Sequence, residues 1–158
     1  MSRTLLAYDP ATDAWTRLAP LIERRDHLAA AALNGELYAL GGRWEVVGEL
    51  RTVEIYNPAT NTWRVGAPMR QPHAGFSAAT VAGQVVIAGG ELIFADRAAQ
   101  ADVEFYDPGP RQWTAGPPLP FGVHGVPVVS DGARVYLLGG SDVPGDIVNF
   151  GRTLIYTP

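Results

Sequence analysis

The chain has 158 residues, 18 of them Gly and 13 Pro, with no Cys, no Lys and a formal net charge of −4. The missing Cys excludes disulfides and thiolate metal sites, and the missing Lys excludes Schiff-base chemistry and a Walker-type phosphate loop. A slightly acidic chain without a basic block is not expected to bind nucleic acid. Hydrophobic residues still make up 47% of the chain, so the many turn residues favour an all-β fold of short strands.

The first segment predicts a strand pair. Residues 3–8 form one strand, and a turn at 9–13 leads to a second strand around Trp15. The apolar stretch before Tyr8 is too short for the core of a signal peptide, so we expect a cytoplasmic protein. Export stays an alternative if the natural N-terminus is missing.

From residue 19 onward, one unit of about 50 residues repeats. Its markers are a small-apolar strand A, a tight turn, a strand B ending in Gly-Gly, a strand C ending in Tyr-x-Pro and a strand D carrying Trp. Strand A is expected at 27–33, 74–81 and 123–130, and strand B at 36–40, 84–88 and 134–138. Tyr-x-Pro begins at Tyr8, Tyr56, Tyr106 and Tyr156, Gly-Gly at Gly41, Gly89 and Gly139, and the tryptophans are Trp15, Trp63 and Trp113.

Four short antiparallel strands cannot bury their own faces, so each unit must stack on its neighbours as a propeller blade. The Trp and Tyr markers are then expected to pack between blades. We expect units at 19–66, 67–116 and 117–158, with 1–18 supplying strands C and D of a further blade. In total this predicts thirteen strands, equal to three four-stranded blades plus one spare strand.

The combination of Gly-Gly, Tyr-Asp/Asn-Pro and Trp resembles kelch repeats, whose units also run to about 50 residues. The resemblance covers essentially the whole chain and departs from the pattern at Val86, in place of a strand B aromatic, and at Thr157 before the last Pro. It implies an all-β, kelch-type β-propeller. In such propellers strand A lies innermost, and the B–C and D–A connections form the partner-binding face.

Three blades are fewer than the 4–8 of typical propellers, so the sequence predicts an incomplete ring. One solution is that the chain is a piece of a longer propeller. The other is a head-to-tail homodimer that forms a six-bladed ring with twofold symmetry, in which this chain is one half. In that ring residues 3–8 and 151–156 compete for a single strand C position.

Candidate binding residues are expected on the B–C and D–A connections, which are longer and differ between units. The B–C loops at 43–47, 91–97 and 146–150 carry apolar residues that either pack over neighbouring blades or anchor a partner. The D–A connections place one His per unit at the mouth of the channel, beside Arg side chains suited to a carboxylate. The candidates are Arg24, Arg25, His27, Trp44, Arg70, His73, Phe94, Arg97 and His124.

These features predict a kelch-type binding module for a protein or an acidic ligand. No catalytic residue, metal site or cofactor is expected, because the chain has no nucleophile elbow and its histidines lie on different blades. Nor is a nucleic-acid or membrane partner expected. The resemblance leaves two alternatives. One is a kelch enzyme like the sugar-acid epimerases or mutarotases, with Arg holding a carboxylate and His or Glu transferring a proton. The other is a partial repeat cassette that needs additional blades.

Overall fold

The computed structural model describes residues 2–144 and 151–157, in which the regular elements are antiparallel β-strands. Two four-stranded sheets are complete blades with the predicted strand order A-B-C-D. The first holds β3 (Ala29–Leu33), β4 (Glu36–Leu40), β7 (Val53–Asn57) and β8 (Thr62–Val65). The second holds β9 (Ser77–Val81), β10 (Gln84–Ala88), β13 (Val103–Asp107) and β14 (Gln112–Ala115).

The two ends of the chain form partial blades. The N-terminal sheet pairs β1 (Leu5–Asp9) with β2 (Ala14–Leu18), which are strands C and D. The last sheet holds strands A, B and C as β15 (Val128–Ser130), β16 (Val135–Leu138) and β17 (Thr153–Tyr156). The predicted set of blade strands is confirmed, but one chain completes only two blades and divides its remaining strands between its ends.

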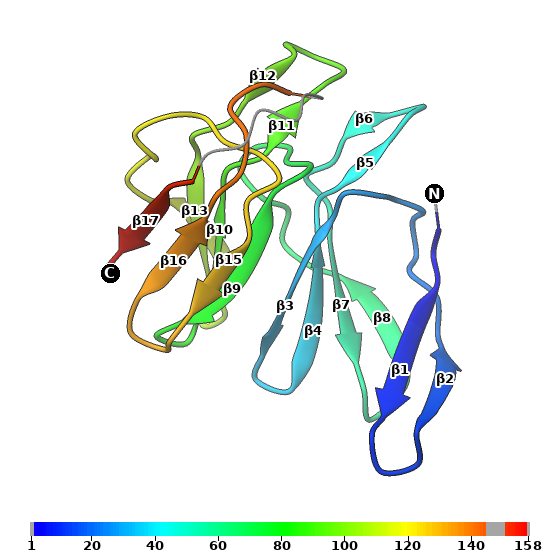
Figure 1. The fold of residues 1–158 in the computed structure, drawn as a ribbon. Helices are drawn as coiled ribbons and strands as arrows, with labels where there is room; N and C mark the ends of the chain where they lie inside the picture. Colours follow the sequence, from blue (N-terminus) through cyan, green and yellow to red (C-terminus); the bar gives the residue numbers. More distant parts are fainter. Residues whose placement is uncertain (1, 145–150, 158) are drawn as a thin grey trace.

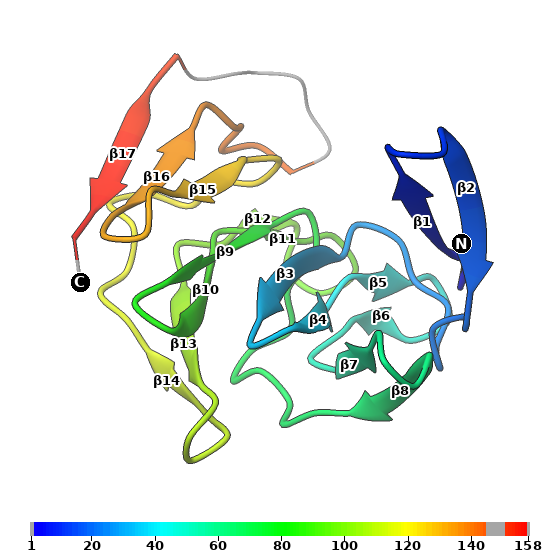
Figure 2. The same ribbon diagram turned by 90° about the horizontal axis from the view of Figure 1, so that it is seen from below.

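The four sheets stand side by side in an arc that stays open between the first and the last sheet (Figures 1 and 2). Strands β3, β9 and β15 lie on the inside of the arc, as expected for strand A (Figure 2). The hydroxyl of Thr80 on β9 donates to the carbonyl oxygen of Ala32 on β3 at 2.6 Å, which ties neighbouring inner strands together.

Hydrophobic cores lie between the first and second blades and between the second blade and the last sheet. Because side chains alternate along a strand, Val85 and Ile87 of β10 face the first blade, whereas Val86 and Ala88 face the last sheet. Trp113 is buried against the first blade, and its indole nitrogen donates to the carbonyl oxygen of Ala67 at 3.0 Å. Trp63 and Trp113 therefore pack backward between sheets, as the sequence predicts, whereas the third marker, Trp15, is exposed at the end of the arc.

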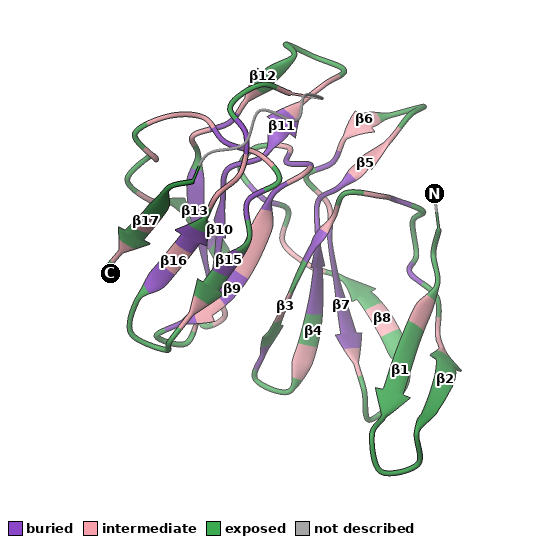
Figure 3. Cartoon of the chain, in the orientation of Figure 1, coloured by how far each residue is buried: buried purple, intermediate pink, exposed green. Residues whose placement is uncertain are grey.

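Burial falls sharply toward the ends of the arc. Strands β4, β7, β10 and β13 are mostly buried, whereas β1 and β2 are exposed along most of their length (Figure 3). Within the described residues, no helix is long and apolar enough to cross a membrane.

Strand A is shorter than predicted in every unit. The segments 27–28, 74–76 and 123–127 precede the strands and belong to the D–A connections. The reason is a residue with positive φ in each connection, at His27, Gly75 and Gly125, which turns the chain before the strand begins.

Two short hairpins were not predicted. The first B–C loop folds into β5 (Arg43–Trp44) and β6 (Gly48–Glu49), and the second into β11 (Glu91–Leu92) and β12 (Ala98–Ala99). Two-residue strands are too short to show the alternation by which a strand is recognised in sequence. Both hairpins project beyond the blades on the same face of the molecule (Figure 1).

Candidate functional site

The D–A connections of the three units meet at the inner end of the face that carries the B–C hairpins. His27, Gly75 and Gly125 hold equivalent positions, with φ angles of 51°, 61° and 60°. The amide of Gly75 donates to the carbonyl oxygen of His27 at 3.0 Å, and that of Gly125 donates to Gly75 at 2.7 Å. These bonds run from unit to unit, and we call the place where the three connections meet the mouth.

The three histidines do not occupy one repeat position. His27 stands where the other units have glycine, and its side chain is exposed. His73 is fully buried, with Nδ1 2.9 Å from the carbonyl oxygen of Gly89. His124 lies one residue before the glycine of its unit and is mostly covered. The structure therefore places His27 and His124 at the mouth and His73 inside the protein.

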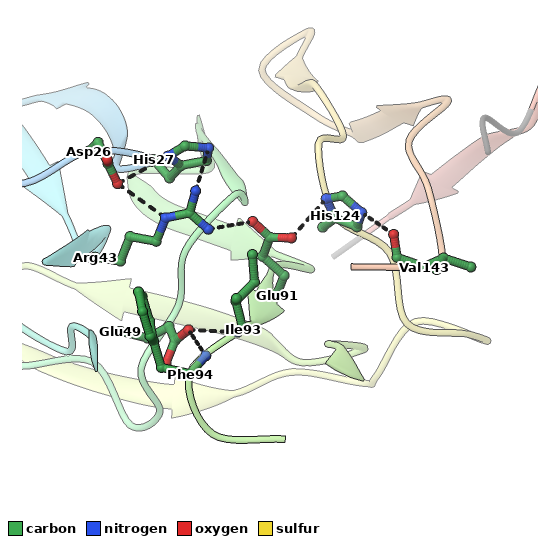
Figure 4. A network of polar contacts seen from close by, with 9 residues as sticks. All are labelled: Asp26, His27, Arg43, Glu49, Glu91, Ile93, Phe94, His124 and Val143. Carbon is green, nitrogen blue, oxygen red and sulfur yellow. Dashed lines mark hydrogen bonds and ion pairs between the residues drawn. The ribbon is translucent and has the colours of Figure 1, made fainter. Parts of the chain in front are cut away.

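A group of five side chains, which we call the mouth cluster, spans all three units (Figure 4). Its members are Asp26, His27, Arg43, Glu91 and His124. Arg43 lies at its centre, with Nε 3.2 Å from Asp26 Oδ1, Nη1 3.0 Å from Glu91 Oε1 and Nη2 3.0 Å from His27 Nε2. One guanidinium thus joins a D–A connection to the B–C hairpins of two blades.

The partners of His27 define which of its ring nitrogens donates and which accepts. A guanidinium only donates, so the Nε2 atom of His27 accepts from Arg43. The proton of the neutral ring then sits on Nδ1, which donates to Asp26 at 3.0 Å. A carboxylate behind one nitrogen and a free electron pair on the other is the arrangement of a general base, with Arg43 covering the electron pair.

His124 is held differently. Its Nε2 donates to the carbonyl oxygen of Val143 at 2.8 Å, because that oxygen can only accept (Figure 4). Its Nδ1 lies 3.3 Å from Glu91 Oε2, a buried oxygen with no hydrogen-bond partner among the described residues. The ring of His124 thus lies between the carbonyl oxygen of Val143 and the carboxylate of Glu91.

The predicted arginines divide into a structural and an exposed group. Arg25 is buried, forms an ion pair with Glu54 and donates to the carbonyl oxygen of Gly41 at 2.8 Å. Its side chain therefore has a structural role and is not part of the candidate binding surface. The same holds for His73. The other three predicted arginines are exposed, and no partner is recorded for their guanidiniums within the described part of the chain: Arg24, Arg70 and Arg97.

The tips of the B–C hairpins carry exposed apolar side chains. Val46 and Val47 form the first tip, and Phe94, which is 51% exposed, forms the second. Glu49 joins the two hairpins, because its Oε1 accepts the amides of Ile93 at 2.6 Å and of Phe94 at 2.9 Å (Figure 4). The tips are therefore held as one surface.

The remaining predicted residues of these loops have different places. Trp44 on β5 is half-buried, beside the first tip, whereas Arg97 lies on the second hairpin with a φ of 49°. The third predicted apolar loop, 146–150, lies outside the described residues.

Sequence reasoning missed the roles of Arg43, Glu91 and Glu49. A signal was present for the first two, since each directly follows the Gly-Gly that ends strand B. Because the two residues hold the same repeat position in neighbouring units and carry opposite charges, an ion pair between them could have been predicted. Nothing in the spacing indicates that Glu49 bonds to the backbone of the next unit. In the described chain, no group of three or more His, Asp or Glu side chains is arranged to hold a metal ion.

Known proteins share both the repeat and the fold. The family described as the Kelch motif matches residues 24–70. The solved structure "Structure of YjhT" superposes with a TM-score of 0.77 at 23% identity and covers 91% of this chain and 53% of that one. At this identity the likeness concerns the fold alone, and this chain spans about half of that structure.

Curated relatives align over stretches about as long as one unit. "Kelch repeat and BTB domain-containing protein 12" of Danio rerio is 50% identical over 42 residues, which are 27% of this chain and 7% of that protein. "Kelch-like protein 9" of Mus musculus is 45% identical over 51 residues, 32% of this chain and 8% of that protein. The chain thus spans less than a tenth of these relatives. By its fold it is a segment of a β-propeller. Residues 24–70 match the Kelch motif, and in its repeat markers the chain is similar to kelch-repeat proteins.

Proposed function

We propose that the chain is an interaction module whose B–C hairpin tips bind a protein partner. The observation that carries the proposal is the exposure of Val46, Val47 and Phe94 on hairpins that Glu49 and Arg43 hold in place. Apolar side chains on a rigid scaffold lose little entropy on binding, and such exposed groups anchor interfaces. The kelch-repeat character of the chain and of its relatives supports an interaction role.

The chemistry of the tips favours a partner segment that combines apolar and acidic side chains. Arg97 lies on the same hairpin as Phe94, and an exposed guanidinium binds a carboxylate through two parallel hydrogen bonds. The rim also holds the exposed Glu45 and Asp96, so the charge preference is local to Arg97. The partner we propose is therefore a peptide with an apolar anchor beside a carboxylate.

A displayed random peptide library selected on the immobilised chain tests this proposal. The enriched peptides should pair an aromatic or aliphatic residue with Asp or Glu, and their affinity should fall about tenfold in Phe94→Ala. Val65→Ala is the matched control, because Val65 is an exposed apolar residue on β8, away from the tips. The proposal would be contradicted if the peptides bound Phe94→Ala and Val47→Ala with the same affinity as the unaltered chain.

A second candidate function is enzymatic and is favoured by the Asp26–His27 pair. A carboxylated sugar that attracts Arg43 would uncover the electron pair of His27 for proton transfer. NMR of such sugars, with and without the protein, would record the rate at which their isomers equilibrate. A rate increase that disappears in His27→Ala would support this candidate, and an unchanged rate with the unaltered protein would eliminate it.

We further propose that the acting form is a pair of chains joined head to tail in one ring. The open arc and the two partial blades at its ends support this assembly. A ring of six four-stranded blades built from two chains uses every blade strand of each chain except one. Two copies joined head to tail form a closed ring when a rotation of half a turn relates them. An arc that spans half of a six-bladed ring meets this condition.

A further inference from the structure

We propose that the cavity between the second blade and the last sheet receives Trp15 of a second copy of this chain, whose β1–β2 hairpin takes the place of β17. This inference rests on the head-to-tail assembly proposed above. It adds which side chain anchors the two copies and which strand is exchanged.

The chain already builds the same indole seat twice. Trp113 donates to the carbonyl oxygen of Ala67 and is buried with Val53 and Met69. Trp63 makes the equivalent bond to Ala19 at 2.8 Å, and Leu5 and Leu21 line the same region. Each seat thus consists of a carbonyl oxygen and an apolar side chain from the segment that follows the preceding strand D, together with an apolar residue of the preceding strand C.

A third seat exists but lacks its indole. An apolar cavity of about 270 Å³ lies between the second blade and the last sheet, lined by Val103, Pro117 and Leu119 among others. These residues occupy the repeat positions of Val53, Ala67 and Met69. The indole is missing because the last sheet has no strand D within the described residues.

Trp15 is the matching side chain without a seat. It is 66% exposed, although it holds the marker position of Trp63 and Trp113. Its ring lies 5.1 Å from that of Tyr8, and the two equivalent Tyr–Trp pairs have ring separations of 5.1 and 5.2 Å. The hairpin therefore presents the pair in its docked geometry before any partner is present.

Strand pairing shows how the hairpin enters. In the first blade, β7 pairs with β4 through Tyr56 opposite Leu37. In the last sheet, β17 pairs with β16 in the same register, with Tyr156 opposite Val135. A β1 strand from the second copy would place Tyr8 at the position of Tyr156. Backbone hydrogen bonds of β17 would be replaced one for one, while β2 and Trp15 would add burial that β17 does not provide.

The opposite end of the arc fits the same docking. A cavity of about 220 Å³ beside β1 is lined by Leu37 and Ala39, the face of the first blade that no full blade covers. Val129 and Leu138 of the last sheet are exposed and hold the repeat positions of Ala31 and Leu40. Ala31 and Leu40 pack against the second blade. When a second copy docks, both ends of the arc therefore form the same kind of blade-to-blade interface that the chain already forms between its first and second blades.

The first experiment measures molar mass by light scattering at several concentrations. We expect a dimer at tens of micromolar and at least a tenfold weaker association in Trp15→Ala, with no loss in the control Val65→Ala. Because Trp15 is exposed in the single chain, its loss should leave the circular dichroism spectrum unchanged. A dimer that Trp15→Ala does not weaken would overturn this inference but leave the head-to-tail proposal standing. A single chain at about 100 µM would overturn both and point to further blades of a longer protein as the occupants.

The second experiment tests the strand exchange. The double variant Tyr136→Cys with Ile155→Cys places two thiols on directly opposed residues of β16 and β17, in a chain with no other Cys. Opposed residues lie within disulfide range, so oxidation should lock β17 in place. We expect the reduced variant to dimerise and the oxidised variant to remain a single chain. Equal dimerisation of both forms would overturn the exchange.

Discussion

At the scale of single residues, two neighbouring arginines show how the fold separates structural from surface charge. Arg25 lies under the D–A connection, where Glu54 also accepts the amides of Ile22 at 2.6 Å and Glu23 at 3.0 Å. Arg24 is exposed. The buried pair therefore pins the connection that leads to the mouth, whereas Arg24 remains available to a ligand.

We predict that Arg25→Ala lowers the free energy of unfolding by about 3 kcal/mol, because it leaves the carboxylate of Glu54 buried without its ion-pair partner. Arg24→Ala, its matched control, should change that free energy by less than about 0.5 kcal/mol. Urea unfolding followed by circular dichroism measures both. Similar losses in the two variants would show that the pair does not stabilise the fold.

The left-handed residues of the mouth allow a second prediction. A side chain at Gly75 would adopt a φ of 61°, and its Cβ would lie 3.2 Å from Glu91. We expect Gly75→Ala to lower the free energy of unfolding by about 1–2 kcal/mol. Gly151→Ala should have little effect, since Gly151 has no positive φ and no atom near the position of a Cβ. An equal effect of both substitutions in urea unfolding would refute the backbone argument.

A third prediction concerns acid. Asp131 accepts the amides of Ala133 and Arg134, and these bonds lower its pKa from the usual 3.8. A lowered folded-state pKa means that the stabilisation is fully present above the unfolded value, near pH 4, and is lost as the pH falls through the folded value. Asp131→Asn should therefore melt below the unaltered chain at pH 7, with a smaller difference at pH 3. A constant difference in melting temperature would contradict this.

The residue scale is also where sequence reasoning reached its limit. The regular spacing of the repeat markers predicted the inter-blade packing of Tyr56, Tyr106 and Trp113, whereas the equivalent Tyr8 and Trp15 are exposed at the end of the arc. The histidines were predicted as one set, yet each stands at a different distance from the double glycine of its unit, Gly41, Gly89 or Gly139. Those unequal distances were visible in the sequence. The contacts of Arg43 with Asp26 and His27 were not, since these residues belong to the D–A connection of its own unit and only the fold brings them to its side chain.

At the scale of elements, strands B and C were predicted well, because their alternation and terminal markers are strong. Strand β4 spans the predicted 36–40, and β10 the predicted 84–88. The B–C hairpins escaped prediction, because tertiary contacts rather than local alternation stabilise them. Glu49 provides such a contact by accepting the amides of Ile93 and Phe94.

We therefore predict that Glu49→Ala loosens the second hairpin without unfolding the blades. Removal of the carboxylate leaves the amides of Ile93 and Phe94 without their acceptor, so their hydrogen exchange should speed up about tenfold. Glu45→Ala is the control, since Glu45 is exposed on the neighbouring tip. Unchanged exchange at these amides in Glu49→Ala would show that the hairpin keeps its shape by other means.

At the scale of the whole molecule, the arc ends in two partial blades whose apolar faces have no cover in a single chain. Leu6, Tyr8 and Trp15 are exposed at one end, and Val129, Leu138 and Ile155 at the other. Exposed sheet edges and faces of this kind promote association, and a closed ring removes them. The face that carries the mouth cluster would then be doubled by symmetry, so that one ring presents two sets of hairpin tips.

Ring closure predicts that thermal stability depends on protein concentration. Because a partner that binds only the folded chain stabilises it by mass action, the melting temperature of the unaltered chain should rise with concentration. Trp15→Ala should show a smaller rise over the same range, since its association is at least tenfold weaker. Calorimetry between about 5 and 100 µM covers the range in which a micromolar dimer forms. A melting temperature that rises equally in both proteins would mean that Trp15 does not close the ring, and one that is constant in both would mean that the two ends of the arc do not meet in a second copy.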